Sequence, residues 1–234
     1  MKCLTWNLEW APPSTRRGVL IRETIDAAEP DVVCYTEVKR DFVPGGHRIE
    51  ADADYGYRHN GSRRKVILWS REPWEDVEIE GDSGLPGGRF ASGVCQGVRF
   101  VGVCIPWRDA HVNSGRKDRS RWEDHLRYCE GLGRVLHRYA QSEYPICVLG
   151  DYNQRIPRFK QPQNVSKALA EAFASGMKVA TEGMTDADDH GLIDHISTSS
   201  ELDVSEIKVL PRFAEDGTRL SDHVGISAVL MPQG

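Results

Sequence analysis

The sequence predicts an α/β fold in which two β-sheets pack face to face and helices lie on the outside. Short apolar segments rich in β-branched residues recur along the 234 residues, with turn residues between them, and each predicts a strand. Three other segments space their apolar residues three and four apart, which is typical of amphipathic helices. No repeat, low-complexity tract or linker interrupts this pattern, so residues 1–234 are expected to form one domain.

The N-terminal half opens with a strand over Lys2–Trp6 and continues with a helix over Arg17–Ala28. Ser14 or Thr15 can cap the N-terminus of that helix, and Pro30 ends it. The remaining strands expected in this half are Asp31–Thr36, Lys65–Ser70, Trp74–Glu80, Phe90–Gln96 and Val98–Ile105.

The C-terminal half contains the longest helical pattern, over Arg119–Tyr139. A short apolar strand follows at Ile146–Leu149, and then a helix over Val165–Ser175 that Gly176 ends. The strands expected to complete this half are Met177–Ala180, Leu192–Thr198, Asp203–Val209 and Val224–Leu230.

Composition limits the function classes. The net charge is −5 and the pI is near 5.9, so any binding of nucleic acid must depend on local basic patches. The six cysteines form no CxxC pair, and five lie in or beside apolar segments, which favours reduced core residues in a cytoplasmic protein. The start of the chain lacks the apolar stretch of a signal peptide, and no segment is apolar enough to span a membrane, so no membrane partner is expected.

Polar side chains lie at the ends of several predicted apolar strands, either directly after the strand or directly before it. If these ends meet on one rim of the sheets, they form a dense group of carboxylates, amides and an imidazole. Several unpaired carboxylates in one place are costly, and a divalent cation relieves that cost. The residues concerned are Asn7, Glu37, Asp151, Asp194, Asp222 and His223.

These residue types suit the hydrolysis of a phosphate ester by water. The reaction builds negative charge on the phosphate oxygens, which a cation and hydrogen-bond donors stabilise. Mg²⁺ prefers oxygen ligands, and this set contains no Cys–His cluster. Asp151 can deprotonate the water, and a histidine held by a carboxylate keeps one tautomer and favours its cationic form.

Five motifs in order, TWN, TEVK, GDYN, IDHI and SDH, resemble those of the endonuclease/exonuclease/phosphatase superfamily. The match runs from Trp6 to His223. It implies a four-layer α/β sandwich of two mainly antiparallel sheets with helices outside. It also implies a metal-dependent phosphoesterase, such as the exonuclease III-like and pancreatic DNase-like members.

The resemblance implies a role for each matching residue. Glu37 is the main direct ligand of the metal, Mg²⁺ or alternatively Mn²⁺, and Asn7 helps to hold it. Glu9 stands where many relatives have an aspartate near the metal, and Asp222 lies near both metal and nucleophile. Asp151 is implied to position or deprotonate water, and Asn153 to help hold water and phosphate. His223 is implied to contact the scissile phosphate, and Asp194 to orient the His223 ring.

One part of the family pattern is altered. Family members have a tyrosine or histidine that touches the phosphate near the end of the strand before the long helix. In VGVCIPWRDAH, residues 101–111, that position falls near Cys104 or Ile105, and neither donates a strong hydrogen bond. Trp107, Arg108 or His111 could take its place.

Basic residues near the motifs favour a polyanionic substrate. Arg155 lies two residues after GDYN, Lys39 matches a lysine of exonuclease III-like members, and Trp107 and Arg108 could bind substrate. A nuclease is therefore the main hypothesis. The alternatives are a phosphatase or phosphodiesterase acting on a small metabolite or nucleotide, and an inactive binding module.

The remaining histidines and one acidic segment have simpler interpretations. The segment 186–197 resembles a calcium loop but has Ser197 in place of the final bidentate glutamate, so calcium is not expected there. The histidines without a matching partner in the sequence are expected to be structural, surface or satisfied residues: His47, His59, His125, His137 and His195.

Overall fold

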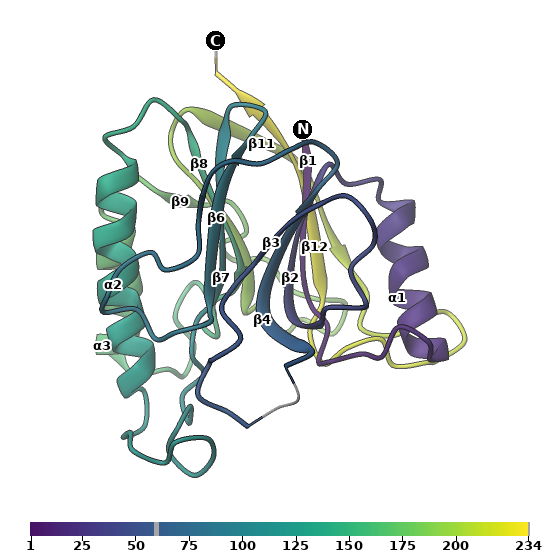
Figure 1. Ribbon diagram of the computed structural model, residues 1–234, viewed down its shortest axis with the longest axis horizontal. Helices are drawn as coiled ribbons and strands as arrows, with labels where there is room; N and C mark the ends of the chain where they lie inside the picture. The colour runs from purple at the N-terminus through teal and green to yellow at the C-terminus, as the bar shows by residue number, and fades with distance from the viewer. Residues whose placement is uncertain (59–60, 234) are drawn as a thin grey trace.

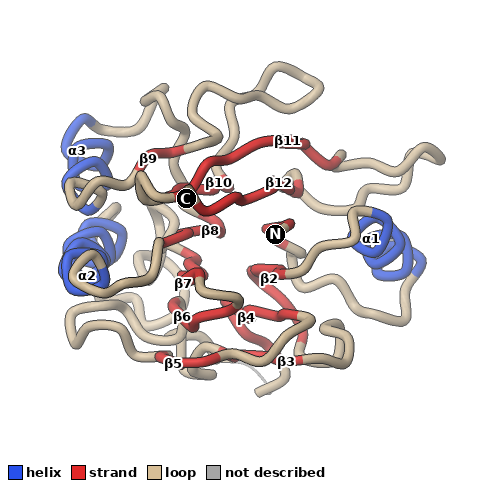
Figure 2. Tube along the Cα trace, turned by 90° about the horizontal axis from the view of Figure 1, so that it is seen from above, coloured by secondary structure: helices blue, strands red, loops and turns tan. Residues whose placement is uncertain are grey.

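Two six-stranded sheets face each other in the computed structural model, which describes residues 1–58 and 61–233 (Figures 1 and 2). His59 lies outside the described residues. The first sheet has the order β11 (Leu202–Leu210), β12 (Gly225–Pro232), β1 (Lys2–Asn7), β2 (Val32–Lys39), β4 (Arg63–Ser70), β3 (His47–Glu50). The second has the order β5 (Glu75–Glu78), β6 (Phe90–Cys95), β7 (Val98–Cys104), β8 (Ile146–Asp151), β10 (Asp194–Thr198), β9 (Lys178–Val179).

The helices cover the outer faces of the two sheets. Helix α1 (Arg16–Ala27) lies against the first sheet, and α2 (Glu123–Tyr139) and α3 (Gln163–Ala172) lie against the second (Figure 2). Each helical face has its own apolar core, and a third core fills the space between the sheets. The predicted two-sheet sandwich with outer helices is confirmed. The pairs β1–β2 and β7–β8 are parallel and the other strand pairs are antiparallel.

Local chemistry explains where the helices begin. Thr15 caps α1, because its Oγ1 accepts a hydrogen bond from the Gly18 N–H at 3.2 Å. The prediction that the long helix starts at Arg119 is wrong. Trp122 has a left-handed backbone with φ of 68°, so the helix starts at Glu123. The Arg119 side chain instead donates to Asp124 Oδ1 at 2.8 Å and joins the preceding loop to the first turn.

Strand β3 was not predicted because three of its four residues are not buried. Only Ile49 reaches the core, so the strand lacks an apolar pattern that could be recognised. None of the described helices is both long and apolar enough to cross a membrane.

Strand register brings the predicted polar ends together on one rim between the sheets. In the first sheet Asn7 pairs with Thr36, the residue before Glu37. In the second, Asp151 lies between Cys104 on β7 and Asp194 on β10. The ends of β1, β2, β7 and β8 and the start of β10 thus form the floor of a site.

Candidate active site

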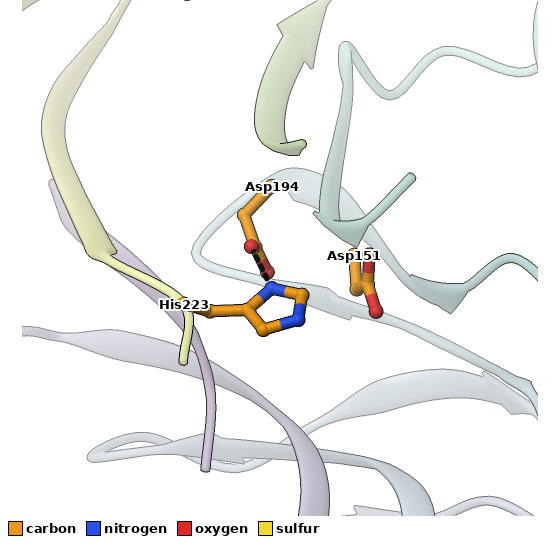
Figure 3. Close-up of side chains that lie close together, drawn as sticks. All are labelled: Asp151, Asp194 and His223. Carbon is orange, nitrogen blue, oxygen red and sulfur yellow. Dashed lines mark hydrogen bonds and ion pairs between the residues drawn. The ribbon is translucent and has the colours of Figure 1, made fainter. Parts of the chain in front are cut away.

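Asp194 and His223 form a tight pair at this rim (Figure 3). Asp194 begins β10, His223 precedes β12, and His223 Nδ1 lies 2.5 Å from Asp194 Oδ2. Burial alone would lower the pKa of His223, but the carboxylates of Asp194 and Asp151 raise it to about 10. The ring therefore remains an imidazolium at neutral pH, with its Nδ1–H directed at Asp194 and Nε2 on the other side.

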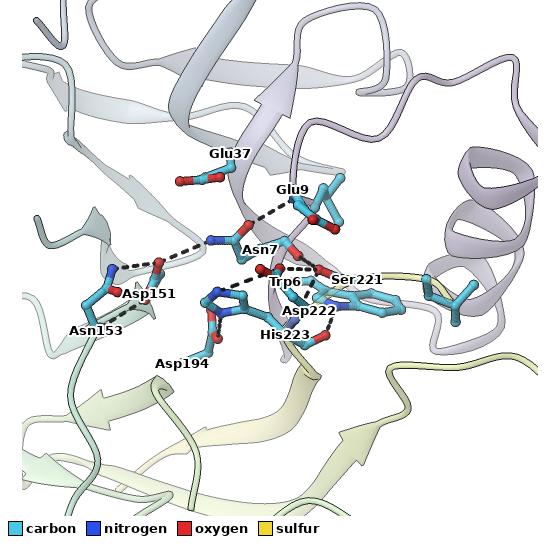
Figure 4. A network of polar contacts seen from close by, with 12 residues as sticks. Trp6, Asn7, Glu9, Glu37, Asp151, Asn153, Asp194, Ser221, Asp222 and His223 are labelled. Atoms are coloured by element: carbon cyan, nitrogen blue, oxygen red, sulfur yellow. Dashed lines mark hydrogen bonds and ion pairs between the residues drawn. The ribbon is translucent and has the colours of Figure 1, made fainter. Parts of the chain in front are cut away.

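Asp151 is buried and surrounded by donors (Figure 4). Its Oδ2 accepts from Asn7 Nδ2 at 3.1 Å and from Asn153 Nδ2 at 2.9 Å, and its Oδ1 accepts from the Asn153 N–H at 2.9 Å. Burial, together with the Asp194 and Glu37 carboxylates, raises the pKa of Asp151 to about 7 although His223 lowers it. A carboxylate with such a pKa is a suitable base at neutral pH.

Glu37 sits at an irregular position in β2, with a φ of 47°. This backbone directs its carbonyl to the Trp10 N–H at 2.8 Å, while its side chain joins the cluster. Lys65 of β4 donates to Glu37 Oε1 at 2.5 Å. Burial would raise the pKa of the Glu37 carboxyl, but the Lys65 ammonium holds it below its usual value, so Glu37 is ionised.

The other two predicted metal residues are placed differently. Glu9 N–H donates to Asn7 Oδ1 at 2.9 Å, but its carboxylate is engaged by Arg17 at 2.8 Å and by Arg219 at 2.7 Å. Those two ion pairs compete with any metal for Glu9. The Asp222 side chain is 53% exposed, with its Oδ1 3.9 Å from His223 Nε2, so it lies at the open side of the cluster.

The predicted substrate-binding residues are spread around the rim. Arg155 lines a pocket together with His223 and Asp222. Trp107 is 44% exposed, and Arg108 is paired with its neighbour Asp109 at 2.9 Å. Lys39 is half-buried at the end of β2. Of these four, Arg155 is the one that the pocket brings beside His223.

Cys104 and Ile105, the two candidates for the altered family position, are both buried. Burial raises the pKa of the Cys104 thiol to about 12, so the thiol stays neutral. His111 lies in a loop, where its Nδ1 accepts from the Arg116 N–H at 3.2 Å. Two cations near Cys104, namely Lys65 and the buried Arg89, were not predicted from the motifs. The signal for Lys65 was a lysine at the start of a predicted apolar strand, and for Arg89 it was an arginine directly before β6.

The oxygen donors on the rim fit a hard divalent cation. Glu37 Oε2 carries no hydrogen bond from any residue in the described ranges, and Asn7 and Asp151 bring an amide and a carboxylate to the same cluster (Figure 4). Mg²⁺ and Mn²⁺ prefer such ligands. A second acidic group at Asp186, Asp188 and His190 is engaged by Arg212, at 3.0 Å from Asp186 and 2.8 Å from Asp188.

A two-sheet sandwich with an imidazolium, a buried carboxylate and oxygen donors on one rim suits the hydrolysis of phosphate esters. Residues 4–223 match the model of the Endonuclease/Exonuclease/phosphatase family, and the chain belongs to this family. The predicted family and enzyme class are thereby confirmed. Comparison with curated protein sequences gave no match.

Solved structures share the fold. The 3′ phosphatase NExo from Neisseria, bound to a product DNA hairpin, has a TM-score of 0.74 and 19% identity, with 99% of each chain covered. The AP endonuclease from Archaeoglobus fulgidus has a TM-score of 0.69 and 17% identity, with 98% of each chain covered.

Two buried histidines beneath the rim predict sensitivity to acid. His125 and His195 both contact Gln154, at 2.7 Å and 3.0 Å, and burial lowers the pKa of each to about 4. The unfolded chain binds their protons at about pH 6.5, so stability is lost as pH falls from about 6.5 towards 4. We expect a slope of up to about 1.4 kcal/mol per pH unit for each proton.

Urea denaturation between pH 7 and 4 measures this effect. His125→Gln should weaken the pH dependence, whereas exposed His137→Gln should leave it unchanged. An identical dependence in both variants and the wild type would contradict the assignment to His125.

Proposed function

We propose that this chain hydrolyses phosphodiester bonds of nucleic acid by attack of water, with Mg²⁺ as cofactor and Mn²⁺ as an alternative. The observation that carries the proposal is the buried Asp151 beside the Asp194–His223 pair, with Glu37 in the same cluster. These groups supply a base, a cationic donor and a metal ligand within one site.

Each residue has a defined role in this reaction. Asn7 and Asn153 fix the Asp151 carboxylate by donating to it, so Oδ1 and Oδ2 keep their directions while a water is deprotonated. Asp194 accepts the His223 Nδ1–H, which leaves Nε2–H to donate to a phosphate oxygen. Glu37, with Asn7 and Asp222, would hold the cation, which when bound neutralises charge on the phosphate oxygens.

A series of aromatic rings near the site favours nucleic acid. Trp10, next to Glu37 through its N–H bond, has its ring centroid 6.0 Å from that of Tyr55, and Tyr57 and His111 continue the series at 5.9 Å and 4.6 Å. The Arg63 guanidinium lies 4.9 Å from the Trp10 ring. Aromatic faces flanked by cations are suited to stacked bases and phosphates. The DNA-bound relative adds support by analogy.

A small phosphorylated metabolite or nucleotide is the second candidate. The net charge of −5 favours it, because an acidic protein repels a long polyanion outside its local basic patches. For either substrate we propose that residues 1–234 act as one domain in the cytoplasm, as six buried free cysteines suit a reducing compartment.

A substrate panel tests the proposal. Single-stranded DNA, nicked DNA with a 3′ phosphate, abasic DNA, RNA and free phosphomonoesters would each be incubated with Mg²⁺ or Mn²⁺. We expect cleavage of nucleic acid, and loss of this activity to background after EDTA. Turnover that survives EDTA would contradict the metal requirement, and turnover of free phosphomonoesters alone would favour the second candidate. Metal binding without any turnover would indicate an inactive module.

A further inference from the structure

A row of residues crosses the rim of the second sheet and includes Asp151, the proposed base. Asp194 pairs with Asp151, and Asp151 pairs with Cys104. Arg89, just before β6, continues the row, because the Cys104 N–H donates to the Arg89 carbonyl at 3.0 Å. Neighbouring strands lie about 4.8 Å apart, so Arg89 is two strand positions from Asp151.

The side chains of this row face the space between the sheets. Ala91, Cys104 and Leu149 belong to the core between the sheets, and alternate strand residues share a face. Arg89 and Asp151 lie two residues from Ala91 and Leu149, respectively. Arg89 therefore points to the same side as the base.

The Arg89 backbone is held firmly. Besides the Cys104 N–H, the Tyr128 hydroxyl donates to the Arg89 carbonyl at 2.7 Å. Arg89 is 2% exposed, and its guanidinium lies over Cys104, with Nη1 donating to the Cys104 carbonyl at 3.3 Å. The charged group thus sits one strand from Asp151.

That guanidinium lacks a counter-ion. Its Nη2 is buried without a hydrogen-bond partner, and among the described residues no carboxylate lies within ion-pair distance of it. The Glu37 carboxylate attracts the Arg89 guanidinium from beyond ion-pair distance, but Glu37 is bonded to Lys65, and the Cys104 thiol is neutral. A buried, unpaired guanidinium cannot lose its proton and is costly to keep. An anion delivered by a ligand would remove that cost.

We propose that Arg89 binds an oxygen of the substrate phosphate from the side opposite His223, and supplies the donor that Cys104 cannot. A guanidinium offers several N–H groups in a plane and matches phosphate geometry. The phosphate then lies between two cations, Arg89 and His223, with Asp151 below. This inference rests on the proposed phosphoester hydrolysis, and it assigns the phosphate position within that site.

The main test compares two buried arginines. Arg89→Met removes the unpaired guanidinium but keeps an unbranched apolar side chain in its place. Arg99 is equally buried, at 2%, but it is ion-paired with Asp76 and lies at the other end of β7. We expect Arg89→Met to lower kcat/KM about 10–100-fold without lowering Tm. Arg99→Met should lower Tm and retain kcat/KM.

A separate readout distinguishes phosphate binding from a structural role. Titration calorimetry with inorganic phosphate and Mg²⁺ should show binding weakened about 10-fold or more in Arg89→Met and Arg89→Lys, but unchanged in Arg99→Met. Guanidinium chloride at millimolar concentration should partly restore the turnover of Arg89→Ala.

The outcomes separate the two proposals. Equal phosphate affinity in wild type and Arg89→Lys would overturn the role of Arg89, even where Arg89→Met fails to fold. A wild-type protein that binds phosphate through Arg89 but hydrolyses no phosphate ester would overturn the proposed reaction and leave the phosphate site standing.

Discussion

The Asp151→Asn variant is expected to lose about 10²–10⁴-fold in kcat, the range that general-base groups contribute. Asn has the same shape as Asp, but its amide cannot accept a proton from water at neutral pH. Asp151 has a raised pKa of about 7, because burial and two neighbouring carboxylates make it more basic than an ordinary aspartate. This carboxylate is therefore well suited to deprotonate water.

The Asp151→Asn variant should still fold, because two effects on its stability partly cancel. Asn removes a buried carboxylate, which favours the folded state. It also places an N–H₂ group among the donors of Asn7 and Asn153, which disfavours it. We therefore expect an unchanged circular dichroism spectrum with a modest shift in Tm.

Single-turnover kinetics on the best nucleic-acid substrate, with saturating Mg²⁺, measures the loss. Asp26→Asn is the matched control, because Asp26 is exposed on α1, remote from the rim. A variant of Asp151 that keeps more than a tenth of wild-type kcat would show that another group deprotonates the water.

The sequence predicted the floor of this site because strand ends carry a readable signal. An apolar run that stops at Asp151 or Asp194 places a polar group at the edge of a sheet whatever the detailed register is. The pairing of Asp151 with Asp194 and with Cys104 comes from the strand order, which only the structure gives.

The walls of the site were harder to predict. Lys65 and Arg89 lie in β4 and just before β6, far from the motifs in sequence, and only the facing of two sheets brings them to the same rim. Glu9 shows the reverse difficulty. The resemblance to the family placed Glu9 near the metal, but Arg219, more than 200 residues away in the chain, pairs with its carboxylate.

Gly150→Ala is expected to destabilise the protein by about 3 kcal/mol or more, a large effect for one methyl group. Gly150 has a φ of 145°, which side-chain-bearing residues rarely adopt. A Cβ there would lie 2.0 Å from the Val103 carbonyl oxygen of the neighbouring strand β7. That carbonyl belongs to a central strand of the sheet, so it cannot move aside without disturbing the β7–β8 pairing.

The same clash should impair catalysis in the molecules that still fold. Gly150 directly precedes Asp151, and a shift of β8 away from β7 moves the base relative to Asp194 and Cys104. A displacement of about 1 Å can lower a rate about 10²-fold. We therefore expect lower kcat at temperatures where the variant is fully folded.

Urea unfolding at pH 7 measures the stability change, with Gly97→Ala as the matched control. Gly97 also has a positive φ, 75°, but nothing lies within 4 Å of its Cβ position. Gly97→Ala should therefore cost only the backbone strain, about 1 kcal/mol, and leave kcat unchanged. If the two variants lose equal stability, the contact with the Val103 carbonyl is not what requires glycine at position 150. The close approach of β7 to β8 beside Asp151 would then need another explanation.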